Sequence, residues 1–437
     1  MLKKFLKYVI PSICSMVIFN LYTLVDGIFV SHFVSDQALA SINVSTPYIT
    51  TIFSIGVLFA VGSSTIISIY RGQDEKNKAD KVFTMNIITI SLIALIISVF
   101  SFFNSEWIVT ILKANADVFD YCNIYIKTLS CFSFFYIVSY CFEVLLKSDG
   151  FPQKSIMGVC LGAITNMVLD PVLMGIIHMG IKGAAIATGL SQLITFCFFL
   201  YHFVFSGKSH YHFVKGNYPW YEYRRLIPLG MSDCISEFSP GIMITIFNIR
   251  INEMLSTGGL VTFSIIMYIY NLVLMVMTGI NQGMQPLISF SYGQNHEKNV
   301  RTYHKYARIM VCICSVFLFG MVEIFARPIT NAFLDINNVN FIDTVRALRL
   351  FSLVFLIMGQ VVITMGYLVA IEKSFKALIL SLLRGIVVVI FCLYAGSYIF
   401  GVNGIWLSCF ISDCICLMVA LYFLYKGVKR NRKCPKN

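Results

Sequence analysis

Long apolar segments, separated by short polar or basic ones, recur along the whole chain. The first runs from Tyr8 to Phe33, and Asp26 is its only charged residue. About 20 apolar residues suffice for a helix to cross the hydrocarbon core of a bilayer. Charge clusters and Gly/Pro positions therefore predict twelve transmembrane helices, over residues 8–33, 43–70, 82–103, 118–146, 153–178, 182–206, 226–252, 260–291, 302–326, 340–370, 375–398 and 401–426.

The composition supports an all-α polytopic membrane protein. Of 437 residues, 58% are hydrophobic and 12% are charged, and the mean hydropathy is +0.79. A soluble protein carries about 25% charged residues. The first apolar segment is too long for a signal peptide and lacks an A-x-A-like cleavage site, so we expect a retained helix. The 14 cysteines lie almost all in apolar segments, where we interpret them as filler.

The basic residues predict how the helices are oriented. Of the 33 Lys and Arg residues, 25 lie at the N-terminus, in the loops after even-numbered segments, or in the C-terminal tail, and six lie in the other loops. Loops rich in Lys and Arg stay in the cytoplasm. Both termini are therefore predicted to be cytoplasmic in a multi-pass protein of the cell membrane. This placement explains the net charge of +12 without a nucleic-acid partner.

The chain contains an internal repeat. A shift of 221 residues aligns "ISIYRGQ" (67–73) with "ISFSYGQ" (288–294) and "GIKG" (180–183) with "GVNG" (401–404). Each repeat holds six helices, an even number, so both enter the membrane from the same side in a parallel repeat. We predict an N-terminal lobe (1–206), a cytoplasmic linker (207–225), a C-terminal lobe (226–426) and a basic cytoplasmic tail (427–437).

Polar residues inside the first lobe fall at matching depth. With a rise of about 1.5 Å per residue, Asp26 lies roughly 27 Å along its helix, and Asp170 lies at a similar depth in the fifth. Asn166 precedes Asp170 by one turn, and Thr188 enters the same layer from the sixth helix. Such a layer could hold a proton or coordinate Na⁺ through oxygen atoms. The alternative is that each acid bonds locally, for example beside Pro171.

The second lobe carries its acids differently. Glu237 lies near the middle of the seventh helix, with Asp233 one turn nearer the cytoplasm. Glu143 and Arg384 lie toward cytoplasmic helix ends, where snorkelling or a structural ion pair is the simpler interpretation. Lys127, deeper in the fourth helix, could neutralise a carboxylate. The methionines of helices 8 and 10 either pack the core or form an adaptable cavity lining; they include Met267, Met275, Met277, Met284, Met358 and Met365.

These landmarks resemble the multidrug and toxic compound extrusion (MATE) transporters along essentially the whole chain. The resemblance rests on the order and spacing of "IPS…LYTLVDGIFV", "ISIYRGQ…KA", "LLKSDGFPQKS", "TNMVLDP", "GIKGAAIATGLSQ" and "GINQGMQPLISFSYGQ". It implies two six-helix lobes around a central cavity. It also implies alternating access driven by H⁺ or Na⁺, and export of organic cations.

Residue by residue, the resemblance implies a cation site in the first lobe. That site would comprise Asp26, Asn166, Asp170 and Thr188, with the carbonyl of Ala184 as a neighbour, and it would hold H⁺ or Na⁺. We expect the two acids to titrate as a unit whose charge switches the first helix between two packings. The remaining expected residues are the helix bend at Pro11 and the substrate cavity of Tyr22, Asp233, Glu237, Gln192, Met267 and Met275.

The tenth helix lacks the acid that some members of the family place there, which weakens the case for a Na⁺ site in the second lobe. The predicted function is secondary active multidrug efflux, by H⁺ or Na⁺ antiport, of small, mostly cationic amphipathic compounds. We expect a monomer without a cofactor other than the coupling ion. A lipid-linked oligosaccharide flippase of the same superfamily is the alternative. A major-facilitator transporter or an enzyme would need signatures that the sequence lacks, and twelve helices are more than a receptor needs.

Overall fold

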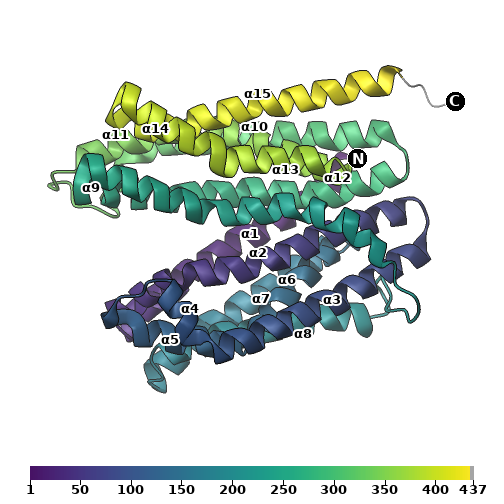
Figure 1. The fold of residues 1–437 in the computed structure, drawn as a ribbon, viewed down its shortest axis with the longest axis horizontal. Coiled ribbons are helices and arrows are strands. Elements are labelled where there is room, and N and C mark those ends of the chain that lie inside the picture. Colours follow the sequence, from purple (N-terminus) through teal and green to yellow (C-terminus); the bar gives the residue numbers. More distant parts are fainter. Residues whose placement is uncertain (434–437) are drawn as a thin grey trace.

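The computed structural model describes residues 1–433, except for the side chains of Ser256, Thr257 and residues 426–433. Its elements form two helical lobes (Figure 1). The N-terminal lobe holds α1 (Leu2–Phe33), α2 (Asp36–Gly72), α3 (Lys76–Phe103), α4 (Ser105–Ile111), α5 (Ala116–Ser130), α6 (Ser133–Ser148), α7 (Pro152–Asp170), η1 (Pro171–Ile176) and α8 (Ile181–Val204). The C-terminal lobe holds α9 (Tyr223–Gly293), α10 (Glu297–Asn331), α11 (Phe341–Ser352), α12 (Phe355–Ala370), α13 (Ser374–Leu382), η3 (Leu383–Val387), α14 (Val388–Phe400) and α15 (Val402–Lys433).

All twelve predicted segments are helical, so the predicted fold class is confirmed. Among the described residues, ten helices are long and apolar enough to cross a membrane, and the pair α5 and α6, bent by 57°, makes up to eleven. The remaining segment is the first part of α9, whose apolar character Asp233 and Glu237 interrupt. The predicted basic tail (427–437) falls on residues whose side chains, and from 434 onward whose backbone, lie outside the described part of the chain.

Helix α9 contains two of the predicted segments because the chain reverses direction within it, between Phe247 and Phe263. The rings of Phe247 and Phe263 stack with centroids 5.2 Å apart. In a straight helix, residues 16 positions apart would be separated by about 24 Å. The two parts of α9 are therefore antiparallel neighbours, as predicted for the seventh and eighth helices.

The sequence repeat is also a repeat of backbone geometry. The fourth span breaks between α5 and α6, and the tenth breaks between α11 and α12. A π-helical turn interrupts the fifth span at η1 and the eleventh at η3. Gly180 and Gly401, 221 residues apart, both have a φ of 59°. Asp74 and Asn295, with the same spacing, have φ values of 61° and 57°.

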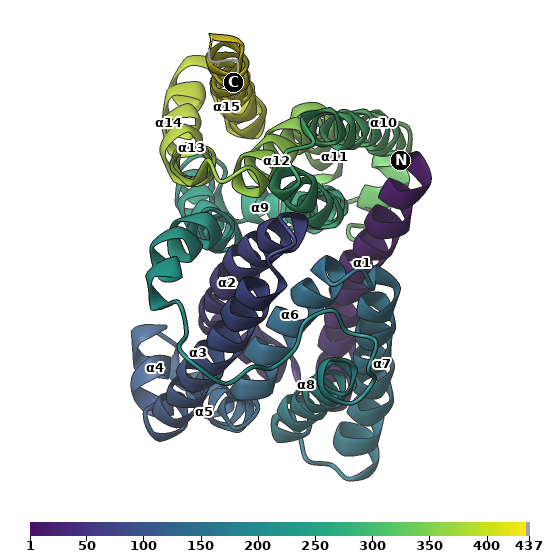
Figure 2. The ribbon, with the colours of Figure 1, turned by 90° about the vertical axis from the view of Figure 1, so that its right-hand side faces the viewer.

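The two lobes pack tightly at one end of the molecule. We call it the basic end; it carries the N-terminus, the α2–α3 turn, the segment 205–222 and the α9–α10 turn (Figure 2). A Cβ atom on Gly72 would lie 2.2 Å from the carbonyl oxygen of Phe290, and one on Gly293 would lie 2.2 Å from that of Ile69. Backbones can approach this closely only where side chains are absent. These glycines therefore allow the lobes to close here.

Polar bonds join the lobes at the same end. The buried Lys147 of α6 donates to Glu143 (2.7 Å) and, across the interface, to Gln282 of α9 (2.8 Å). Gln282 in turn donates to the hydroxyl of Tyr140 (3.1 Å). Glu143 thus belongs to a buried ion pair rather than to a snorkelling side chain. Because burying a charge is costly unless it is paired, this network specifies one fit between the lobes.

Candidate functional site

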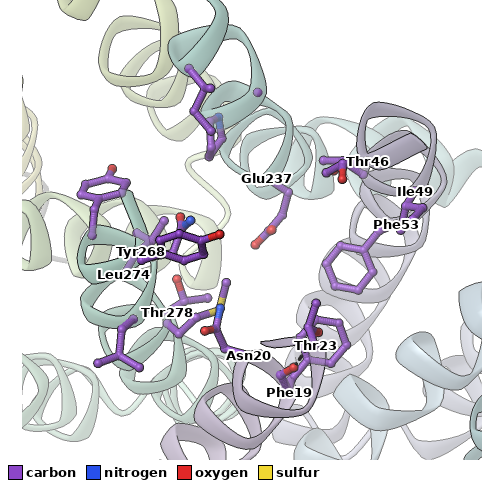
Figure 3. A pocket seen from close by; sticks show the side chains of 18 of the residues that line it. Phe19, Asn20, Thr23, Thr46, Ile49, Phe53, Glu237, Tyr268, Leu274 and Thr278 are labelled. Atoms are coloured by element: carbon purple, nitrogen blue, oxygen red, sulfur yellow. Dashed lines mark hydrogen bonds between the residues drawn. The ribbon is translucent and has the colours of Figure 1, made fainter. Parts of the chain in front are cut away.

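A cavity of about 1050 Å³ lies between the lobes, in the half of the molecule away from the basic end. Helices α1 and α2 form one wall, and α9 contributes much of the other. Glu237 points into the open space from α9, while Phe19, Thr23 and Phe53 face it from α1 and α2 (Figure 3). The charged residues that line it are four acids and one base, namely Asp26, Asp233, Glu237, Asp413 and Arg384.

The acid pair of the N-terminal lobe is assembled as predicted. Asp26 reaches the cavity wall from α1, whereas Asp170, at the end of α7, is fully buried behind it. The two carboxyl groups are close enough to interact electrostatically, although the described residues show no hydrogen bond between them. Asn166 Nδ2 lies 3.4 Å from Asp170 Oδ1 and 3.5 Å from the hydroxyl of Thr188. The structure therefore brings the four side chains of the predicted layer together.

The bend in the fifth span positions this pair. Pro171 follows Asp170 directly and has no N–H to donate to the carbonyl oxygen one turn earlier. The chain continues as the π-helical turn η1 instead of an α-helix. Turns of this kind occur frequently at functional sites. Asp170 consequently ends α7 with its carboxyl group turned toward α1.

The pair has acceptor oxygens without donors. Among the described residues, no hydrogen-bond partner reaches the buried atoms Asp26 Oδ1, Asp170 Oδ2 and Asn166 Oδ1. A buried polar atom without a partner costs free energy, and a buried carboxylate without one costs more. A proton, or a small cation that prefers oxygen ligands, would supply what these oxygens lack. Ala184 is buried nearby, in a cluster with Val30 of α1.

The acids of the C-terminal lobe line the same cavity. Asp233 and Glu237 occupy successive turns of α9, and Asp233 Oδ2 is buried without a partner within the described residues. Arg384 donates from Nε to Asp413 Oδ1 at 3.0 Å, which makes the expected ion pair. The pair, however, lines the central cavity and is not confined to a helix end.

The other predicted residues are placed as follows. Tyr22 and Met275 line the cavity. Gln192 instead accepts a hydrogen bond from Ser139 (3.0 Å), and Met267 packs in the core of the C-terminal lobe, so the structure brings neither to the cavity wall. Pro11 lies inside α1, which continues through it as one helix.

Two residues play parts that the sequence did not indicate. The exposed Lys127 lies over the ring of Phe102 and not beside a carboxylate. Asn281, inside the resemblance motif "GINQG", lines the cavity, and its Oδ1 is buried without a partner among the described residues. An amide in an apolar helix is a signal that could have identified it.

Comparison with known proteins places the chain in a family. The family model MatE matches twice, at residues 11–172 and 234–395, once in each lobe. The chain is 22% identical over 434 residues to the multidrug export protein MepA of Staphylococcus haemolyticus, covering 98% of this chain and 94% of that protein. MepA of Staphylococcus aureus (strain bovine RF122 / ET3-1) is also 22% identical, with 97% and 93% covered.

Solved structures share the fold along the whole chain. One, described as the outward-facing conformation of a multidrug resistance MATE family transporter, superimposes with a TM-score of 0.92 at 20% identity, covering 99% of this chain and 97% of that one. A second, a transporter of the MOP superfamily from Pyrococcus furiosus Vc1 (DSM3638), gives a TM-score of 0.90 at 21% identity, with the same coverage. With the family model matched in both lobes, the chain belongs to the MATE family of multi-span membrane transporters.

Proposed function

We propose that this protein is a secondary active exporter of amphipathic organic compounds, most of them cationic, driven by antiport of H⁺ or Na⁺. The observation that carries the proposal is the cavity between the lobes, with four acids and one base on its walls. Its volume of about 1050 Å³ suits a drug-sized ligand. The named relatives are multidrug export proteins. We place the basic end in the cytoplasm, so that this conformation is open to the outside.

We further propose that the acid pair of the N-terminal lobe couples the ion to transport. Asp26 and Asp170 lie too close together, and too deeply, for both to carry a charge without a counterion. A proton would neutralise one of them. Alternatively, Na⁺ would be held by Asp26, Asn166, Asp170 and Thr188, with the carbonyl of Ala184 as a neighbour. Either ion removes the repulsion and lets α1, α7 and α8 close together.

Closure of these helices would shrink the cavity on the side of the N-terminal lobe and expel the substrate outward. Pro11 gives α1 a place to bend, because it removes one backbone hydrogen bond from the helix. The flippase alternative is less favoured, because a cavity with a surplus of acids would repel a pyrophosphate group.

Transport in reconstituted vesicles tests the proposal. Vesicles loaded with tetraphenylphosphonium are placed under an imposed pH gradient, an imposed Na⁺ gradient, or neither. We expect one of the gradients to drive the cation against its concentration, and the same gradient to be dissipated by its transport. Movement that neither gradient accelerates would overturn the antiport mechanism.

Glu237→Gln is expected to weaken the binding of monovalent cations by about tenfold while neutral amphipathic compounds still move. Glu237 projects into the cavity, whereas the exposed Glu253, which pairs with Arg250 at 2.9 Å, does not line it. Glu253→Gln is therefore the matched control. The measurement is the apparent affinity for tetraphenylphosphonium against that for uncharged triphenylphosphine oxide. An equal loss for both compounds would make Glu237 a coupling residue instead.

A further inference from the structure

Arg384 is the one base among the charged residues that line the cavity. The π-helical turn η3 carries it, together with Gly385. A Cβ atom on Gly385 would lie 2.1 Å from the hydroxyl oxygen of Ser239, so this glycine lets the eleventh span press against α9. The guanidinium is consequently held beside the part of α9 that bears Glu237.

The ion pair with Asp413 leaves part of the guanidinium free of the carboxylate. Only Nε of Arg384 donates to Asp413, at 3.0 Å, so the terminal nitrogens Nη1 and Nη2 lie outside this pair. Tyr270 lines the same cavity. A guanidinium has five N–H donors in a rigid fork that matches a carboxylate. The edge with the terminal nitrogens is therefore available for a second carboxylate.

Burial makes this edge selective. The side chains of Arg384 and Asp413 are 13% and 6% exposed, so water competes weakly for the N–H donors of the guanidinium. Ser412, next to Asp413 on α15, also lines the cavity, and its hydroxyl is buried without a partner among the described residues. Two sets of donors on one wall suit the oxygens of an anionic group.

The opposite charge is present in the same cavity. Asp233 and Glu237 offer carboxyl groups on α9. The turn between them contacts the eleventh span through Ser236, whose hydroxyl lies 3.4 Å from that of Ser381. A single drug-sized ligand could therefore place an ammonium group near Glu237 and a carboxylate on Arg384 at the same time.

We propose that Arg384, held by Asp413, forms a subsite of the cavity that binds the carboxylate of amphipathic zwitterionic substrates. This inference rests on the proposed export function and specifies its substrates. The ammonium end of the ligand lies toward Asp233 and Glu237, and the carboxylate takes two parallel hydrogen bonds from Nη1 and Nη2. Because the ion pair of Arg384 and Asp413 is neutral as a whole, the subsite recognises a carboxylate by its planar shape and hydrogen-bond acceptors more than by its charge.

The test compares a fluoroquinolone that carries an ammonium and a carboxylate with its methyl ester, which is a monocation of nearly the same shape. Arg384→Lys keeps the charge beside Asp413 but loses the fork, and Arg384→Gln/Asp413→Asn removes both charges together. In each variant, the ratio of zwitterion affinity to ester affinity should fall at least about tenfold, since two charge-assisted hydrogen bonds are lost. Arg250→Lys, on the same lobe but bonded to Ser397 and Glu253, should leave the ratio unchanged.

Binding is measured on the detergent-purified parent protein as well as on the variants, by calorimetry. The parent should bind the zwitterion at least as tightly as the ester; an ester that binds more than about tenfold tighter would overturn the proposal. Parallel losses for both compounds in Arg384→Lys would also overturn it. If the parent protein binds the zwitterion as expected, and the ratio of zwitterion to ester affinity falls in the variants, but no gradient drives export, the result would contradict only the proposed export function.

Discussion

Asp170→Asn is expected to abolish gradient-driven export without unfolding the protein. The substitution keeps the shape of the side chain but removes the group that, with Asp26, holds the proton or Na⁺. Changing a group that merely supports an ion site typically costs about 10- to 100-fold, so the loss of a ligand should cost at least that much. Export of tetraphenylphosphonium should fall to the level of vesicles without protein.

The stability of the variants separates coupling from folding. Replacing one of two facing buried carboxyl groups removes a repulsion, so Asp170→Asn and Asp26→Asn should melt at or above the temperature of the parent. Asp343→Asn, an exposed acid in the first turn of α11, should retain export and serves as the matched control. Export at the parent rate by either buried variant would remove the pair from the mechanism.

Gly72→Ala is expected to shift the transporter away from the conformation that is closed at the basic end. The added methyl group would lie 2.2 Å from the carbonyl oxygen of Phe290, which belongs to a helix backbone and cannot turn aside. Overpacking of this kind costs about 1–3 kcal/mol. Because the cost falls on the closed state alone, the ratio of open to closed molecules should rise by about 5- to 150-fold.

Spin labels report this shift as a distance. Labels at the exposed positions Lys76 and Lys298, one on each lobe, should move apart in Gly72→Ala and in Gly293→Ala. The double variant Gly72→Ala/Gly293→Ala should destabilise the closed state by less than the sum of the two single substitutions. One separation of the helices relieves both contacts. A Cβ atom on Gly320 would meet nothing within 4 Å, so Gly320→Ala is the control. Unchanged distances in both variants would refute the role of these glycines.

The residues of the coupling site could be found in the sequence because a charge inside an apolar helix is conspicuous. Asp26, Asn166, Asp170 and Thr188 were predicted in one layer from their distance along each helix, and the structure brings them together. The position of a residue along a helix gives its depth in the membrane. It does not show whether the side chain faces the cavity or lies behind another side chain. That Asp170 is sealed behind Asp26 follows from the direction of α7, which the sequence did not indicate.

The C-terminal lobe shows where this reasoning stops. Arg384 was assigned to a helix end, but it lines the cavity, because the π-helical turn η3 alters the direction in which side chains leave the helix. Gln192 and Met267 were expected on the cavity wall from their residue types and lie elsewhere. A polar or soft side chain in a membrane helix has several partners available, and the neighbouring helices select among them.

The glycine contact at the basic end has a consequence for the ancestry of the chain. Gly72 and Gly293 occupy the same position in the two repeats, and a Cβ atom on Gly72 would lie 3.1 Å from the Cα atom of Gly293. A residue that meets its own counterpart marks a twofold axis, as at the interface of an isologous dimer. Before duplication, a half-length chain of six helices could have made this contact with a second copy of itself. A single glycine position in that half-length chain would then have allowed the close backbone approach in both subunits.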